Sequence, residues 1–314
     1  MKEKATSDRG ALGASIDFEC TDPVLVRRLF SSRVLKDLGN SKLPAELSNV
    51  LACLERSGQL KTGLTLAALY DAAFKFCFRN QRVEYFYKNA LVEKLVLGRR
   101  SLSTTAAYLE VRIAEAKLDV LLVGQHMSAY EIKTDFDELA RLPAQLKAYQ
   151  RACRQVSVLT GERYAASVDK LIDPEVGLSI LTNRYQLRVL RPAAIFDNAL
   201  VRSDMLTLLR RSELLHLLQR LGVDVKQIPN TRVFQEAVAA SQKMTTIALN
   251  AYVAELLLAR SSTKRSLIQA LPMSLAASSF AQDLTKTQVA RLIDLFEMDV
   301  NRGLRSELLP VFSR

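Results

Sequence analysis

The sequence has few of the residues on which several common kinds of active site depend. It contains only two histidines, His126 and His216, and neither has a second ligand at the spacing of a zinc site. Two such isolated histidines also give no support to a Ser–His–Asp catalytic set. The scattered glycines form neither a GxGxxG fingerprint nor a Walker A loop, so we expect no ATP site.

Clustered cysteines and long apolar runs are also lacking. The four cysteines are scattered without a CxxC pair, as expected for ordinary thiols in a reducing cytosol. No apolar stretch approaches the roughly 18 residues needed to cross a bilayer. The N-terminal segment lacks the apolar core of a signal peptide. We therefore expect a cytoplasmic protein without membrane contact.

What the sequence does contain is the composition of a globular protein with a sizeable core. Its 314 residues are 49% hydrophobic and 25% charged, which excludes a disordered or collagenous chain. The formal net charge of +11 is spread along the chain rather than concentrated in one tail. Such a surface favours a polyanionic partner, nucleic acid above all, although many soluble proteins are equally basic.

The period of the hydrophobic pattern changes along the chain. Helical spacing from residue 22 to 97 gives way to short β-type segments, which alternate with helical ones until Pro192, and the rest is helical again. The predicted strands cover 107–113, 118–123, 129–134, 155–160, 177–182 and 186–192. The later predicted helices cover 137–155, 165–172, 204–221, 233–260, 264–281 and 286–296.

This pattern predicts an α/β fold whose central part has the element order α–β–β–β–α–β. We divide the chain into three segments. Residues 1–79 form an N-terminal tail and helical region, residues 80–195 a core of mixed sheet flanked by helices, and residues 196–314 a helical C-terminal region.

One constellation of charged residues lies on two neighbouring predicted strands. Glu131 and Lys133 are two residues apart on a strand and therefore share a face. The GQHMS segment before them predicts a hairpin, which brings Asp119 of the preceding strand beside them. Two carboxylates and an ammonium group suit metal-assisted phosphodiester cleavage, because carboxylate oxygens bind Mg²⁺ or Mn²⁺. Lys133 would orient or deprotonate the attacking water, or offset charge on the phosphorane.

Asp119, a gap of eleven residues and then Glu131-Ile-Lys133 resemble the PD-(D/E)XK motif of the restriction-endonuclease-like nuclease superfamily. Leu118 stands where that motif has its usual proline. The resemblance implies that Asp119 and Glu131 are metal ligands and that Lys133 serves the attacking water. It also implies that Glu84, in a helix upstream of the strands, supplies a third carboxylate to the metal, directly or through water.

A second motif follows the first. Gln145 and Tyr149 resemble the QxxxY motif of the RecB-like branch of this superfamily and share one helical face. They could help to place Lys133 or the DNA backbone, but Tyr149 also fits an apolar stripe and could be a core residue. The wider stretch of residues 80–222 resembles an uncharacterised bacterial family assigned to this superfamily, which implies a restriction-endonuclease-like core.

Three further charged residues can also be interpreted as partners in ion pairs. Glu110 and Arg112, two apart on a predicted strand, could contact metal or phosphate, and an edge-strand ion pair explains them equally well. Lys88 shares a helical face with Glu84, and we interpret it as the i,i+4 partner of that carboxylate, outside the metal site.

Our main hypothesis is a metal-dependent nuclease that hydrolyses phosphodiester bonds, most readily those of DNA, in phage defence or mobile-element maintenance in bacteria. The alternative is a nucleic-acid-binding or regulatory protein with the same core that does not cleave. A third interpretation is a protein-interaction module whose C-terminal helices bind a partner or a second copy of the chain.

Overall fold

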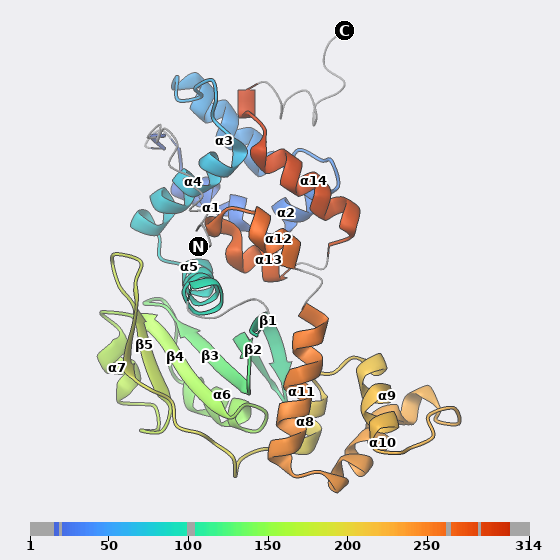
Figure 1. The fold of residues 1–314 in the computed structure, drawn as a ribbon. Helices are drawn as coiled ribbons and strands as arrows, with labels where there is room; N and C mark the ends of the chain where they lie inside the picture. The colour runs from blue at the N-terminus through green and yellow to red at the C-terminus, as the bar shows by residue number, and fades with distance from the viewer. Residues whose placement is uncertain (1–15, 19–20, 99–103, 262–264, 282–283, 302–314) are drawn as a thin grey trace, which may run out of the picture.

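The structure of the protein is a computed structural model that describes residues 16–18, 21–98, 104–261, 265–281 and 284–301. Helices from the two ends of the chain lie together on one side of a β-sheet, and a further group of helices extends from another side (Figure 1). The predicted N-terminal tail falls on residues outside this description.

Six strands form one mixed sheet in the order of the chain. They are β1 (Ala106–Ile113), β2 (Ala116–Val123), β3 (Met127–Lys133), β4 (Gln155–Gly161), β5 (Gly177–Leu181) and β6 (Leu187–Arg191). β1, β2 and β3 are antiparallel, β4 and β5 run parallel to β3, and β6 returns antiparallel to β5. Each strand lies where the sequence pattern predicts one, so the α/β class is confirmed.

Helices precede, interrupt and follow the sheet. They are α1 (Pro23–Arg27), α2 (Ser32–Gly39), α3 (Ala45–Arg56), α4 (Leu66–Asn80), α5 (Glu84–Leu91), α6 (Leu142–Gln150), α7 (Ala165–Asp169), α8 (Arg202–Leu206), α9 (Arg211–Arg220), α10 (Val233–Ala240), α11 (Thr246–Ser261), α12 (Arg265–Ala270), α13 (Ala276–Ala281) and α14 (Lys286–Glu297). α5 continues as a π-helical segment, η2 (Val92–Gly98). The order α5–β1–β2–β3–α6–β4 is the predicted one.

Several of the later helices are shorter than their hydrophobic spacing predicts. The predicted helix 165–172 is only α7, the predicted helix 204–221 is divided into α8 and α9, and the predicted helix 264–281 is divided into α12 and α13. The predicted helix 137–155 is only α6, because the Asp137 carboxylate accepts hydrogen bonds from the Thr134 backbone N–H and hydroxyl and holds a turn there. The predicted helix 233–260 is broken between α10 and α11. Met244 is extended (φ −114°, ψ 156°), and the Thr245 hydroxyl accepts the Ala248 N–H to start the next helix.

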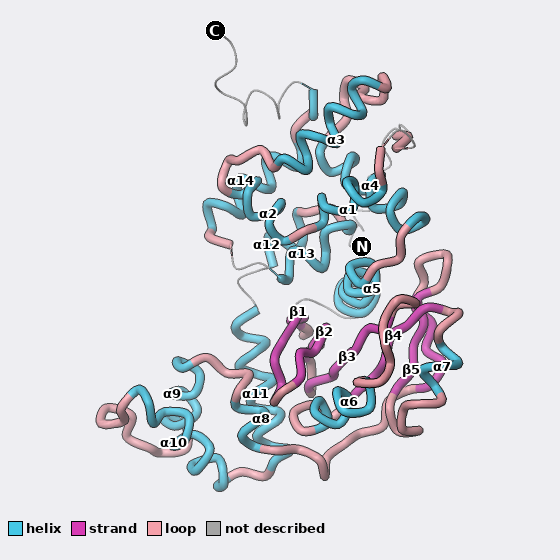
Figure 2. The backbone as a smooth tube through the Cα atoms, turned by 180° about the vertical axis from the view of Figure 1, so that it is seen from behind, coloured by secondary structure: helices cyan, strands magenta, loops and turns pink. Residues whose placement is uncertain are grey.

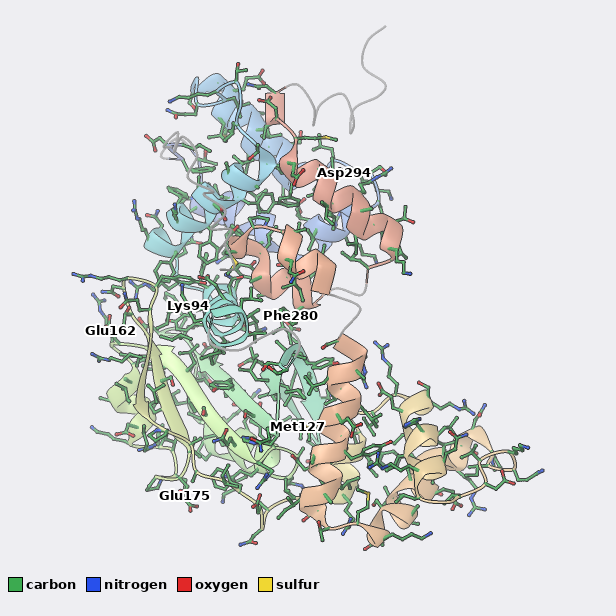
Figure 3. The ribbon with its side chains drawn as sticks, in the orientation of Figure 1. Lys94, Met127, Glu162, Glu175, Phe280 and Asp294 are labelled. Atoms are coloured by element: carbon green, nitrogen blue, oxygen red, sulfur yellow. The ribbon has the colours of Figure 1, made fainter. Side chains whose placement is uncertain are left out.

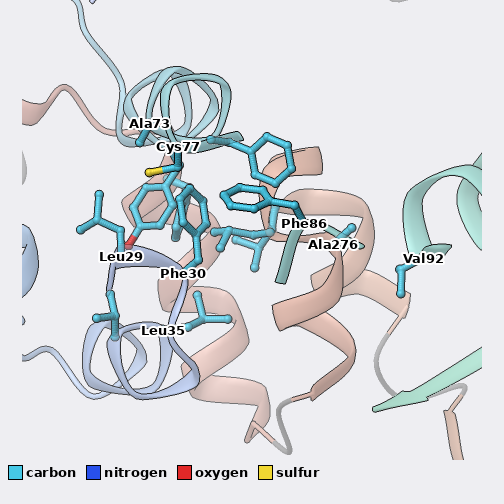
Figure 4. Close-up of a cluster of buried hydrophobic side chains, with 14 of the residues drawn as sticks. Leu29, Phe30, Leu35, Ala73, Cys77, Phe86, Val92 and Ala276 are labelled. Carbon is cyan, nitrogen blue, oxygen red and sulfur yellow. The ribbon is translucent and has the colours of Figure 1, made fainter. Parts of the chain in front are cut away.

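The first of two hydrophobic cores joins the ends of the chain to one face of the sheet. Side chains from α1–α5 pack with those of α12–α14 and with Val120, Leu122 and Ile132 of the sheet. Phe30 is a centre of this core, with the rings of Tyr70, Phe74, Tyr85 and Phe86 around it. Figure 4 shows part of this cluster, with Phe30, Phe86 and Ala276 among its labelled residues. The N- and C-terminal helices therefore form one packed layer.

The second core lies on the opposite face of the sheet. Leu121, Val123 and Ala129 point toward this side, where α6, α7, α8 and the α9–α11 group cover them. Figure 2 shows α6 lying against the strands from this side, with α9–α11 beyond β1. The residues after Pro192 are thus shared between two cores, with α8–α11 in the second and α12–α14 in the first. The three-segment division of the chain remains a prediction.

In the described part of the chain, no helix combines the length and the apolar character required to span a bilayer.

Candidate active site

The candidate site begins where the pairing of β2 with β3 ends. The last regular pair is Val120 with Tyr130, and the same register places Asp119 opposite Glu131. At this point the Asp119 side chain replaces a backbone acceptor, because its Oδ2 accepts the Ile132 N–H at 2.7 Å. Opposite residues of an antiparallel pair share a face. Asp119 and Glu131 therefore lie side by side where the regular pairing of β2 with β3 ends, a point that we call the fork between the strands.

β3 adds a lysine to this pair. Glu131 and Lys133 are 2% and 8% exposed, and the Lys133 Nζ donates to Glu131 Oε1 at 2.8 Å. Ile132, between them, packs into the core on the opposite face of the sheet. The alternation of a strand therefore places one carboxylate and one ammonium group side by side, as the sequence predicts.

α6 supplies the next layer of contacts. Gln145 Oε1 accepts from Lys133 Nζ at 3.0 Å, and the Tyr149 hydroxyl lies 2.7 Å from Glu131 Oε2. The same hydroxyl lies 2.9 Å from the Lys117 carbonyl oxygen. Tyr149 is fully buried and belongs to the second core, so it is both a core residue and a partner of the site. Burial and the neighbouring Glu131 carboxylate raise the pKa of this hydroxyl, which acts as a donor.

The pKa of the Asp119 carboxyl is strongly shifted by its surroundings. Burial, followed by the charges of Glu131 and Glu84, raises the pKa of the Asp119 carboxyl to about 8, against the Ile132 hydrogen bond and the Lys88 charge, which lower it. Two carboxylates that repel each other in a partly buried place gain stability from a cation between them. The Asp119 carboxyl is therefore suited to binding a positive charge.

Glu84 lies at the start of α5, near this pair but turned toward a different partner. Lys88 Nζ lies 2.5 Å from Glu84 Oε1 and 3.1 Å from Glu110 Oε1. Burial lowers the pKa of Lys88, but its bonds to Glu84 and Glu110 and the charge of Asp119 outweigh burial and raise it overall. Lys88 is the predicted i,i+4 partner of Glu84. It also joins the carboxylates of Glu84 and Glu110, a role that helical spacing alone did not indicate.

Glu110 departs from regular strand geometry. It faces Asp119 in the register of β1 and β2, but its φ is +57°, in the left-handed region that few residues other than glycine adopt. Its carboxylate binds Lys88 and, at 2.5 Å, Lys117. The ion-pair interpretation of Glu110 therefore holds. Arg112 is exposed on β1, and its cross-strand neighbour is Lys117; no contact of Arg112 with Asp119 or Glu131 is found in the described part of the chain.

The oxygen atoms present suit a small divalent cation. Within the described residues, no three side chains among His, Cys, Asp and Glu are arranged to hold a metal ion. Mg²⁺, however, usually binds through one or two carboxylates and takes its remaining ligands from water and substrate phosphate. Asp119 and Glu131 provide such a pair of carboxylates, and each Glu131 oxygen would bind the ion beside the hydrogen bond that it already accepts, Oε1 from Lys133 and Oε2 from Tyr149. Glu84, the third predicted ligand, is close enough to raise the pKa of Asp119 but is bound to Lys88.

Comparison with known proteins connects this chain to a phage family. The family described as Bacteriophage P4 protein cII matches residues 78–286. Protein cII of Enterobacteria phage P4 is 28% identical over 140 residues, which is 43% of this chain and 53% of that protein. The chain thus spans about half the length of this curated relative. No solved structure matches the chain significantly.

Proposed function

This chain belongs to the Bacteriophage P4 protein cII family, and from the geometry of its candidate site we propose that it is a metal-dependent nuclease. The observation that carries the proposal is the fork between β2 and β3, where Asp119, Glu131 and Lys133 meet. The element order from α5 to β4 around this fork supports a restriction-endonuclease-like core. The family match contains every residue of the proposed site.

Asp119 and Glu131 would hold Mg²⁺ or Mn²⁺ through oxygen. When bound, the ion polarises a phosphoryl oxygen and lowers the pKa of a bound water. Asp119 Oδ2 already accepts the Ile132 N–H, so Oδ1 is the oxygen left for the cation. Glu84 could reach the same place only through water or after release from Lys88.

Lys133 acts on the substrate as a hydrogen-bond donor. Its ammonium group carries three hydrogens, and Glu131 and Gln145 accept two of them. The third is available to a water or to a phosphate oxygen, where a positive charge stabilises the developing phosphorane. Gln145 and Tyr149 are positioning residues, because they contact Lys133 and Glu131 from α6.

The setting that we propose is nucleic-acid processing in the life of a phage or another mobile element. The supporting observation is the family itself, whose curated relative is a protein of phage P4. DNA is the expected substrate, and the basic net charge of +11 is consistent with a polyphosphate partner.

A cleavage assay tests the proposal. Purified protein is incubated with labelled single-stranded DNA, duplex DNA and RNA, in Mg²⁺, in Mn²⁺ and in EDTA. We expect cleavage with either metal, none in EDTA, and a loss of about 100-fold or more in Asp119→Asn and Lys133→Met. Glu115→Gln is the matched control, since it removes an exposed carboxylate in the turn between β1 and β2. Circular dichroism checks that each variant is folded.

Two results would refute the nuclease proposal. One is the absence of cleavage in every substrate with either metal, and the other is full activity of the Lys133→Met variant. In the first case, binding of the same substrates without cleavage would favour the alternative, a nucleic-acid-binding or regulatory protein on the same core.

A further inference from the structure

A charged cleft lies beside the candidate site, at the carboxyl ends of β3 and β4. Its volume is about 520 Å³, which is in the range of pockets that hold a small organic molecule or a nucleotide. Asp135 and Phe136, just after β3, form one wall, and Gly161 and Glu162, at the end of β4, form another. Figure 3 labels Glu162 at this end of the sheet.

The lining of the cleft lies close to residues of the candidate site along the chain in two places. Phe136 follows Lys133 by three residues, and Arg82 and Val83 of the cleft come directly before Glu84. Lys133 pairs with Thr160 in the β3–β4 ladder, one residue before Gly161 of the cleft wall. The cleft wall and the candidate site are therefore built from neighbouring segments of the chain.

Three arginines from separate segments line the cleft. They are Arg27 at the end of α1, Arg82 before α5 and Arg163 after β4. No ion pair of these three is found among the described residues, whereas Arg151, Arg154 and Arg191 pair with carboxylates. The Arg82 guanidinium lies 5.1 Å from the centre of the Phe78 ring, which holds it in place. These guanidinium groups are available to phosphate.

Phe136 is the residue of the cleft that favours single-stranded over duplex nucleic acid. Its side chain is 84% exposed, the highest among the large hydrophobic residues that are exposed in the described part of the chain. It therefore takes no part in either core, and it stands at the wall of a cleft that carries unpaired arginines. An exposed aromatic ring beside positive charge is the arrangement on which unpaired bases stack. In a duplex the bases are already stacked on each other and cannot reach such a ring.

We propose that this cleft binds a single strand of nucleic acid, with a base stacked on Phe136 and the backbone phosphates held by Arg27, Arg82 and Arg163. The proposal deepens and rests on the nuclease function, because it assigns single-stranded nucleic acid as the substrate that is led to Lys133. The acidic Asp135 and Glu162 limit the net positive charge, so stacking contributes a large part of the affinity.

Binding in EDTA tests the cleft separately from cleavage. Fluorescence anisotropy is measured with a labelled single-stranded 12-mer of thymidine and with a duplex of the same length at several salt concentrations. We expect tighter binding of the single strand and a loss of roughly tenfold in Phe136→Ala. Arg163→Ala should weaken binding and reduce the salt slope of log Kd by about 0.7. Arg291→Ala, an exposed arginine on α14, is the matched control and should bind as the unaltered protein does.

The outcomes separate the two proposals. Unchanged affinity in Phe136→Ala, or tighter binding of duplex than of single strand, overturns the cleft assignment, even if the protein cleaves. Loss of single-strand binding in Phe136→Ala upholds the assignment, even if no cleavage is seen and the nuclease proposal fails. Because Phe136 lies outside both cores, its replacement leaves the packing of the fold intact.

Discussion

At the scale of single residues, Asp119 serves two needs that oppose each other. Its Oδ2 closes the fork by accepting the Ile132 N–H, while its neighbour Glu131 disfavours a second negative charge in the same place. Removing a charge of this kind is a recurrent way to stabilise a protein at the expense of its activity. The site should therefore reduce the stability of the metal-free protein.

We predict that Asp119→Asn stabilises the metal-free protein at alkaline pH. The pKa of Asp119 is about 8 in the fold and 3.8 ordinarily. A carboxyl with a raised folded pKa contributes its full stability below the lower value and loses that contribution as the pH rises through the higher one. Asparagine does not ionise. The variant should therefore be more stable by about 1–2 kcal/mol near pH 8.5 and equal near pH 4.

Thermal melts from pH 4 to pH 9 in EDTA measure this difference. Adding Mg²⁺ should then raise the melting temperature of the unaltered protein and leave that of the variant almost unchanged, since only the former has both carboxylates. Equal pH dependence of the two proteins would contradict the electrostatic account of Asp119.

At the same scale, the residues on β2 and β3 and the pairing of Lys88 with Glu84 could be predicted, but the contact of Lys88 with Glu110 could not. A period of two and a hairpin loop suffice to place Asp119, Glu131 and Lys133 on one face. The contact of Lys88 with Glu110 depends on how α5 crosses β1, which no local pattern records. The left-handed φ of Glu110 is equally hidden, because a glutamate in a strand-like sequence gives no sign of it.

At the scale of elements, the pairing of β4 with β5 leaves no room for a side chain at Gly177, the first residue of β5. A Cβ atom on Gly177 would lie 2.5 Å from Ser157 Oγ and 2.9 Å from the backbone nitrogen of Ala193. Backbone atoms cannot move aside as a flexible side chain can. Position 177 therefore requires glycine, because Ser157 and the backbone of Ala193 lie too close to leave room for a side chain.

We predict that Gly177→Ala lowers the free energy of unfolding by roughly 1–3 kcal/mol, as overpacked positions do. Urea unfolding measures the change. Gly39→Ala is the control, because its Cβ would meet the Gln288 side chain at 3.3 Å, which can shift, and alanine favours a helix. A similar loss of stability in both variants would show that the backbone contact at Gly177 is not the cause.

Hydrophobic periodicity predicts which elements form but not where the helices end. All six strands and most helices follow from hydrophobic period, because burial of one face imposes that period. Helix ends do not, since polar contacts set them: the Asp137 carboxylate delays the start of α6, and an extended Met244 divides α10 from α11. Each of these contacts depends on a single polar side chain or one extended residue, which a hydrophobic pattern does not reveal.

At the scale of the whole molecule, the first core couples the two ends of the chain to the sheet. Phe296 of α14 is 1% exposed, and its ring centre lies 5.1 Å from that of Tyr70 in α4. No sequence pattern predicts this pairing, because the partners are more than two hundred residues apart and either helix could bury its face elsewhere.

We predict that Phe296→Ala lowers the free energy of unfolding of the whole fold by about 3–5 kcal/mol, the usual cost of truncating a buried phenylalanine to alanine. Calorimetry should show one transition at a lower temperature, since this core includes both terminal helical groups and one face of the sheet. Leu190→Ala, on the exposed part of β6, is the control and should change little. A separate early transition of the helices would show that the sheet is stable without them.

The shared layer of terminal helices also has a consequence for synthesis of the protein. α1–α4 leave the ribosome before the sheet does, but their partners in α12–α14 follow only after the sheet and α8–α11 have been made. At about 5–20 residues per second, this interval lasts roughly 10–40 seconds. We expect nascent chains arrested before α12 to remain sensitive to protease within α1–α4, while chains that include α12–α14 are resistant there. Synthesis must then reach α12–α14 before the first core, which packs against the sheet that carries Asp119, Glu131 and Lys133, can form.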